Sequence, residues 1–189
     1  VDFQEIKTLQ FEGNWDEATS RMIEFARKLE IAGADCILIC TNTMHKMAKE
    51  VDESVSIPLI HIADATAHEI VKKEIKKVAL LGTAFTMEQD FYKGRLIEKF
   101  GLDVIVPNEA DREIVHNIIY EELCLGIIKE ESKQAYLQII NDLIQKGAEA
   151  VILGCTEITL LVNQNNCSIP LFDTTRIHAE SAVTFALNE

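Results

Sequence analysis

Short apolar runs alternate with longer amphipathic stretches along the chain, and two of the runs are nearly the same. Residues 33–45 read Gly-Ala-Asp-Cys-Ile-Leu-Ile-Cys-Thr-Asn-Thr-Met-His, and residues 147–157 read Gly-Ala-Glu-Ala-Val-Ile-Leu-Gly-Cys-Thr-Glu. Branched apolar residues without alternation are typical of strands buried on both faces of a parallel sheet. The pattern predicts two equivalent strands that end at Cys40 and Cys155, at the sheet edge where α/β proteins bind ligands.

The similarity continues beyond the two cysteines. Ser-Ile-Pro-Leu occurs at 56–59 and again at 168–171, and a helix-like run follows each copy, at 63–73 and 175–187. Self-similarity of this kind is the signature of internal duplication. We therefore predict that one half of the protein is a copy of the other, and that each copy brings one cysteine.

Strand-like and helix-like segments alternate between the copies, which predicts βα units and a mainly parallel sheet. The expected fold is α/β, with two pseudo-symmetric, duplicated domains and a site in the cleft between them. A charged run at 72–77 is the predicted crossing point between the domains. The first domain would comprise residues 1–74 and 172–189, and the second residues 75–171. Further strands are expected at 78–83, 102–106 and 169–172, and helices at 14–33, 111–125 and 130–146.

The duplication also predicts a strand that this sequence does not contain. The strand at 78–83 lies far ahead of Cys155, and the same distance ahead of Cys40 falls before residue 1. If the two halves have similar lengths, the first strand of the first domain and its loop, roughly 40 residues, are expected outside this sequence.

Composition and charge narrow the classes of function. The formal net charge is −13, which argues against nucleic acid or an anionic membrane as a partner, because both bind clusters of Lys and Arg. No apolar run approaches the roughly 18 residues of a membrane span, and we expect a cytoplasmic protein. Five cysteines without the short spacings of a disulfide framework are expected to be thiols. No metal site is expected, because Cys36 and Cys40 would lie about 13 Å apart on a strand.

Two cysteines at equivalent strand ends indicate proton transfer. A free thiol titrates at about 8.5, and at a lower pH near the start of a helix. Cys40 and Cys155 each precede a predicted helix, so we expect a lowered pKa for both thiols. One thiolate could remove a proton from a carbon acid while the opposite thiol protonates the other face, which inverts the stereocentre.

The two motifs, Cys-Thr-Asn-Thr-Met-His at 40–45 and Gly-Cys-Thr-Glu-Ile at 154–158, resemble the signatures of the cofactor-independent aspartate/glutamate racemase superfamily. The stretches at 61–66 and 82–92 are similar to its broad-specificity amino-acid racemase branch. The resemblance implies an amino-acid substrate, no pyridoxal phosphate or other cofactor, and a homodimer. It makes Cys40 and Cys155 the acid/base pair and Glu157 the residue that orients or polarises the second thiol. The α-carboxylate would be held by Asn42, Thr43, Thr83 and Thr156 together with backbone amides of the same turns, and Thr41 and Glu157 would also belong to the substrate-binding residues.

The sequence differs from aspartate-specific members of the family at the residues that would contact the substrate side chain. Those members hold the second carboxylate with an Arg and a Lys, whereas residues 1–7 contain no Arg and Cys124 stands at the Lys position. A buried carboxylate without its charge partners costs several kcal/mol. We therefore expect neutral or varied amino acids as substrates, with an aspartate-specific racemase as one alternative.

Two further classes of function stay open. One is a related reaction on the same fold, such as arylmalonate decarboxylation, maleate isomerisation or hydantoin racemisation. The other is a non-catalytic role in binding an amino acid or in redox chemistry. Three cysteines, Cys36, Cys124 and Cys167, are expected to be core residues, and His45 and His61 are expected to satisfy hydrogen bonds rather than to catalyse.

Overall fold

The computed structural model describes residues 1–187 of the 189 in the sequence. The helices are α1 (Phe3–Phe11), α2 (Trp15–Ile31), α3 (Ala48–Asp52), α4 (Ile62–Lys72), α5 (Ala84–Glu88), α6 (Asp90–Phe100), α7 (Glu109–Glu121), α8 (Glu130–Gln145) and α9 (Thr174–Leu187). The 3₁₀ turns are η1 (Thr43–Met47), η2 (Leu123–Leu125), η3 (Ile158–Leu160) and η4 (Gln164–Asn166). The strands are β1 (Lys77–Gly82), β2 (Asp103–Ile105), β3 (Ala150–Gly154) and β4 (Leu171–Asp173).

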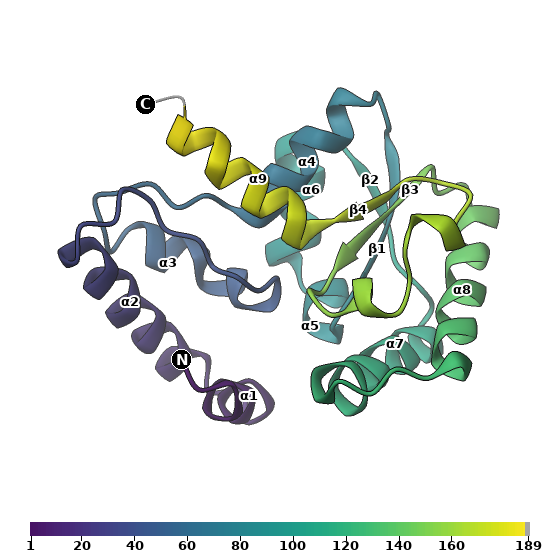
Figure 1. Cartoon of the computed structure of the whole chain (residues 1–189), viewed down its shortest axis with the longest axis horizontal. Coiled ribbons are helices and arrows are strands. Elements are labelled where there is room, and N and C mark those ends of the chain that lie inside the picture. The colour runs from purple at the N-terminus through teal and green to yellow at the C-terminus, as the bar shows by residue number, and fades with distance from the viewer. Residues whose placement is uncertain (188–189) are drawn as a thin grey trace.

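The four strands form one parallel sheet in the order β2-β1-β3-β4. Side chains on one face of β1 and β3, such as Leu80 and Ile152, pack under α4 and α6, and those on the other face, such as Leu81 and Leu153, pack under α7 and α8 (Figure 1). Burial on both faces explains why these strands are continuously apolar. The strands predicted at 78–83, 102–106 and 169–172 are confirmed.

The N-terminal part of the structure, residues 1–61, has its own apolar core. Side chains from α1, α2, η1 and α3 surround the segment around Ile37 and Ile39. The prediction of a full strand that ends at Cys40 is wrong: Ile37 and Leu59 form a single parallel bridge, and the Ile37 N–H donates to the carbonyl of Pro58 at 2.9 Å. Within residues 1–187, the segment around Ile37 has a paired neighbour on one side only, and a full strand does not form there. In contrast, β3 is paired on both sides, by β1 and β4.

The remaining residues, 62–187, form the sheet part of the structure. It includes α4, whose Ala67 and Ile70 pack against the sheet, and α9, which lies beside α4. β4 spans the predicted domain boundary between residues 171 and 172. The predicted domain bounds stay a prediction.

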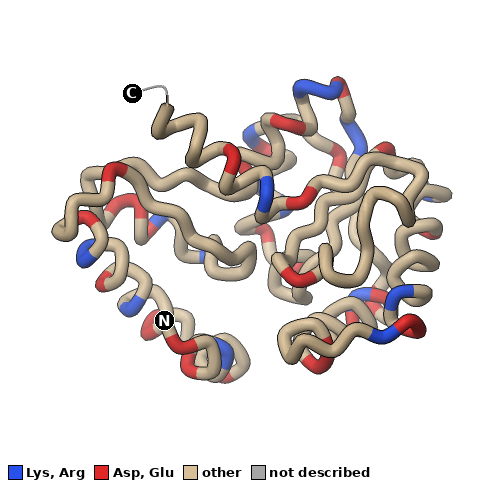
Figure 2. The backbone as a smooth tube through the Cα atoms, in the orientation of Figure 1, with Lys and Arg blue, Asp and Glu red and all other residues tan. Residues whose placement is uncertain are grey.

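Charged residues of both signs are interspersed along the outer helices, as Figure 2 shows for α2 and α8. The loops that face one another between the N-terminal and sheet parts carry few charged residues. Within residues 1–187, no helix is long and apolar enough to cross a membrane.

Candidate active site

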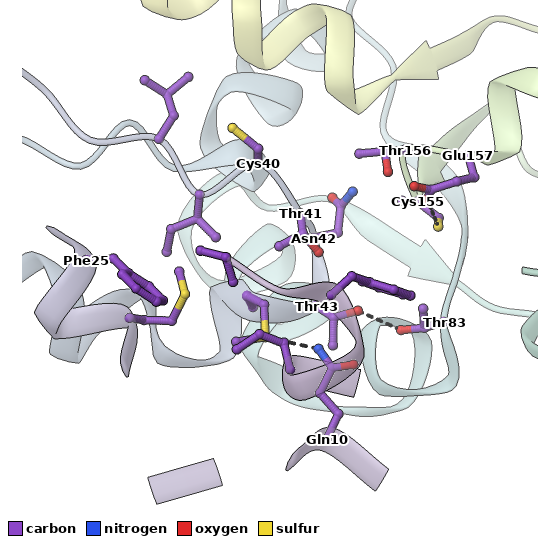
Figure 3. Close-up of a pocket in the computed structure, with 18 of the residues that line it drawn as sticks. Gln10, Phe25, Cys40, Thr41, Asn42, Thr43, Thr83, Cys155, Thr156 and Glu157 are labelled. Carbon is purple, nitrogen blue, oxygen red and sulfur yellow. Dashed lines mark hydrogen bonds between the residues drawn. The ribbon is translucent and has the colours of Figure 1, made fainter. Parts of the chain in front are cut away.

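A cavity of about 430 Å³ lies between the N-terminal and sheet parts. It brings together every site residue predicted from the sequence, because its lining includes Cys40, Thr41, Asn42, Thr43, Thr83, Cys155, Thr156 and Glu157. Figure 3 shows the first four on one side of the cavity and Cys155, Thr156 and Glu157 on the other. The two cysteine motifs, distant in sequence, therefore face a common space.

Cys155 follows the last residue of β3 and is buried. Its thiol donates to the Oε2 of Glu157, with 3.0 Å between the sulfur and the oxygen. Burial raises the pKa of Cys155 well above its usual range, and the charge of Glu157 raises it further. The prediction of a lowered pKa is therefore wrong for this thiol. The helical segment after it, η3, is a single 3₁₀ turn, whose dipole is too small to offset desolvation.

Cys40 follows the bridged segment of the N-terminal part and is exposed. In the view of Figure 3, its sulfur is directed away from Cys155. Both thiols line the cavity, but in this structure they do not point at one another.

Three threonine hydroxyls meet beside the cysteines. The Thr43 hydroxyl lies 2.9 Å from that of Thr83 and 3.4 Å from that of Thr86, and all three side chains are buried. Thr43 comes from η1, whereas Thr83 caps α5. Each hydroxyl can rotate to donate or accept, so this cluster can present O–H donors to a carboxylate.

Asn42 is held by a residue that the sequence analysis did not single out. The Nδ2 of Asn42 donates to the hydroxyl of Thr174 at 3.1 Å, and that hydroxyl donates to the carbonyl of Leu153 at 2.8 Å. Asn42 and Thr174 are both buried. The chain of bonds links the turn after Cys40 to the strand that leads to Cys155.

The sequence from residue 1 to 182 matches the family model described as Asp/Glu/hydantoin racemase. The chain belongs to this family. A candidate Asp/Glu racemase from Yersinia pestis has the same fold with a TM-score of 0.92 and 53% identity, and the match covers 99% of this chain and 81% of that chain. An aspartate racemase homologue from Pyrococcus horikoshii gives a TM-score of 0.84 and 38% identity over 98% of this chain and 80% of that chain. The broad specificity amino-acid racemase RacX of Bacillus subtilis is 28% identical over 173 residues, which are 89% of this chain and 72% of that protein.

Gln10 and Tyr120 complete the cavity of this Asp/Glu/hydantoin racemase family member. The phenol of Tyr120 donates to the Oε1 of Gln10 at 3.0 Å, and the Nε2 of Gln10 donates to the sulfur of Met44 at 3.0 Å. Burial raises the pKa of Tyr120, which keeps the phenol protonated as a donor. The sequence analysis missed Gln10 because it missed α1, although Asp2 caps this helix and Ile6 and Leu9 mark its buried face. Tyr120 lies in α7, where a helix was predicted, but its role beside the cavity depends on its contact with distant Gln10.

The lining beyond Gln10 is apolar. It is formed by side chains from α2 and the bridged segment, namely Met22, Phe25, Ala26, Leu29, Ile37 and Ile39. Among the cavity-lining residues in the described part of the chain, none is Lys or Arg, and Glu157 is the one acidic residue. The cavity of this family member therefore offers apolar contact and neutral polar groups to a ligand side chain.

His45 supports the turn that carries Cys40. Its Nδ1 lies 2.8 Å from the carbonyl of Thr41, and its Nε2 accepts from the N–H of Ile62 at 3.1 Å. The ring is therefore a neutral imidazole with the proton on Nδ1, and burial lowers its pKa well below the usual range. The expected hydrogen-bonding role of His45 is confirmed.

Proposed function

We propose that the protein is a cofactor-independent amino-acid racemase in which Cys40 and Cys155 act as the two acid/base residues. The observation that carries this proposal is that the cysteines of both duplicated motifs line one cavity. Family membership agrees with an isomerase that acts as a racemase. The similarity to RacX of Bacillus subtilis supports broad specificity.

The proposed reaction moves two protons at one carbon. In one direction, the Cys40 thiolate removes the α-proton and becomes a thiol, while the Cys155 thiol gives its proton to the opposite face and becomes a thiolate. Because its pKa is raised, Cys155 is a protonated thiol when the substrate binds and can act as the acid. The negative charge of Glu157 disfavours a thiolate beside it, so Cys155 regains a proton readily. The reverse direction exchanges the two roles.

The threonine turns are the proposed binding site for the α-carboxylate. Thr43 and Thr83 offer hydroxyl donors in a buried setting, where hydrogen bonds to a charged acceptor are stronger than in water. Thr41 and Thr156 line the cavity next to the two cysteines. A substrate held there has its α-carbon within the space that both cysteine motifs face.

The proposed substrates are amino acids with neutral side chains of varied shape. A second carboxylate in the apolar part of the cavity would meet no Lys or Arg among the described lining residues, and an unpaired buried charge is costly. Apolar side chains instead gain contact with residues such as Phe25 and Ile39.

Proton NMR in D2O tests the proposed activity. L- and D-amino acids with apolar, polar, acidic and basic side chains are incubated separately with the protein, and each is followed for loss of the α-proton signal and for gain of the opposite enantiomer by chiral chromatography. We expect both changes, fastest for neutral side chains. Absence of both for every amino acid would contradict the proposed activity.

A second candidate is a reaction that uses one cysteine as the sole proton donor, such as decarboxylation of a substituted malonate. The observation that favours it is the orientation of Cys40, whose sulfur is directed away from Cys155 in Figure 3. In that chemistry a Cys40→Ser variant would keep its activity and a Cys155→Ser variant would lose it, whereas the two-base reaction needs both.

A further inference from the structure

The side-chain amide of Asn42 has one allowed orientation. Thr174 has a single hydroxyl proton, and it is donated to the carbonyl of Leu153, a group that can only accept. Toward Asn42, the same hydroxyl oxygen must therefore act as an acceptor. Only the Nδ2 of Asn42 can donate to it, which fixes the amide nitrogen on the side of Thr174.

The amide oxygen consequently points the other way, and it lacks a partner. Asn42 is 2% exposed, and its Oδ1 is buried without a hydrogen bond to any described residue. Asn42 lines the cavity between the two cysteine motifs. Buried polar atoms are nearly always satisfied, so this oxygen is suited to a ligand that donates a hydrogen bond.

We infer that the Oδ1 of Asn42 accepts an N–H of the substrate's α-ammonium group, and that Thr174 is the positioning residue that aims this oxygen. The inference rests on the proposed amino-acid substrate. It differs from the role expected from the sequence, in which Asn42 holds the α-carboxylate. A carboxylate has only acceptor atoms and is repelled by an amide oxygen, whereas an ammonium group has three donors and no acceptor.

Two other side-chain oxygens that line the cavity each already have a donor, whereas the Oδ1 of Asn42 has none among the described residues. The Oε1 of Gln10 already accepts from Tyr120, and the Oε2 of Glu157 already accepts from Cys155. The hydroxyls of Thr43 and Thr83 can turn to donate, and so they suit the carboxylate. The two ends of an amino acid are then bound by different residues: the carboxylate by hydroxyls and the ammonium group by Asn42.

The test compares two ligands that differ only in the ammonium group. Binding of DL-leucine and of 4-methylpentanoate is measured by titration calorimetry for the wild type, Asn42→Ala, Thr174→Val and Thr174→Ser. Racemic leucine is used because turnover leaves its composition unchanged. We expect Asn42→Ala to weaken leucine binding by about 10- to 100-fold, the range for a hydrogen bond to a charged group, and to change 4-methylpentanoate binding by less than about twofold.

Thr174 is tested by its effect on the same ratio. Thr174→Val removes the hydroxyl and leaves the amide of Asn42 free to rotate, so the preference for leucine over 4-methylpentanoate should fall by about tenfold. Thr174→Ser keeps the hydroxyl and should restore the preference. A merely structural role would weaken both ligands alike, and thermal denaturation of each variant reports on folding. Thr43→Val is the contrasting variant, which should weaken both ligands because both have the carboxylate.

The outcomes separate this inference from the proposed activity. If Asn42→Ala weakens both ligands equally, or if the wild type binds no leucine, the assignment of Asn42 to the ammonium group is wrong even where racemisation is observed. If the ligand preference depends on Asn42 and Thr174 but no amino acid exchanges its α-proton, the inference stands and the racemase proposal fails.

Discussion

The thiol of Cys155 donates a hydrogen bond to the carboxylate of Glu157 across 3.0 Å. This contact keeps the proton on sulfur for two reasons. The carboxylate accepts the S–H, and its negative charge opposes the formation of a thiolate beside it. In the proposed reaction, Cys155 is therefore suited to donate a proton, and we expect Glu157 to control how readily it does so.

Replacement of Glu157 by Gln is expected to lower the pKa of Cys155. The variant removes the negative charge that raises this pKa, while its amide keeps the side chain polar. The rate at which iodoacetamide modifies Cys155 should therefore reach half of its maximum at a lower pH than in the wild type, as followed by mass spectrometry of the modified peptide. Glu157→Asp, which keeps the charge, is the control. An unchanged pH profile for Glu157→Gln would show that Glu157 does not raise the pKa of Cys155.

Replacement of either cysteine by Ser is expected to abolish racemisation. Each direction needs one base and one acid, and loss of a positioned proton-transfer group costs about 10²- to 10⁴-fold in rate. Chiral chromatography of the product gives the rate for Cys40→Ser and for Cys155→Ser. Cys167→Ser is the matched control, because Cys167 does not line the cavity. If either active-site variant keeps more than about a tenth of the wild-type rate, the two-base assignment is wrong.

The stability of the fold is expected to fall as the pH drops below about 6.5, the ordinary pKa of histidine. Burial lowers the pKa values of His45, His61 and His178, in the case of His61 to about 3. The unfolded chain then binds more protons than the folded one, so the stability is complete above the unfolded value and is lost as the pH falls toward the folded values.

Urea denaturation at pH 8, 7, 6 and 5 measures this loss. The Nε2 of His178 donates to the carbonyl of Ile60, and Gln can make a similar bond without titrating, so His178→Gln should reduce the dependence on pH. Asp64 does not confound the experiment: although burial raises its pKa, bonds from Arg95 and Lys99 lower it to about 2. Its contribution is lost only at pH values well below 5. A stability that stays constant or rises between pH 7 and 5 would contradict the prediction.

Introduction of a cation into the cavity is expected to shift the preference toward acidic substrates. Cys124 lines the cavity and is half-buried, and the pKa of its thiol is raised to about 11, by burial first and by Glu157 second. In Cys124→Lys the ammonium group can pair with a second carboxylate, so kcat/KM for aspartate relative to leucine should rise by about tenfold, as expected for a charged hydrogen bond. Cys124→Met is the uncharged control. An equal ratio for the Lys and Met variants would place the substrate side chain away from Cys124.

The duplication in the sequence was sufficient to predict that Cys40 and Cys155 share a site, and the family resemblance added the polar residues of the turns beside them. Cys40 and Cys155 end equivalent segments, and both segments lead into the same space. What the sequence could not predict depends on contacts between distant positions. Thr174 lies 132 positions from Asn42, and Tyr120 lies 110 positions from Gln10, so no local pattern pairs them.

Two other differences between the sequence prediction and the structure also arise from tertiary contacts. The pKa of Cys155 is set by burial and by the orientation of the Glu157 side chain, neither of which is visible from a predicted helix start. The segment around Ile37 has the composition of a strand, but strand formation needs a paired neighbour as well as a propensity. The buried strand β3, which has partners on both sides, matches its prediction.

The hydrogen bonds that join the N-terminal part to the sheet part include those from Tyr120 to Gln10, from Asn42 to Thr174, and between Thr43 and Thr83. Separation of the two parts breaks all three, and at about 1 kcal/mol each these bonds alone raise the free energy of the open state by about 3 kcal/mol. Fewer than about one molecule in a hundred is then open at any moment. A ligand too large to enter the closed cavity binds only this fraction, so its apparent affinity is more than about a hundredfold weaker than its affinity for the open form.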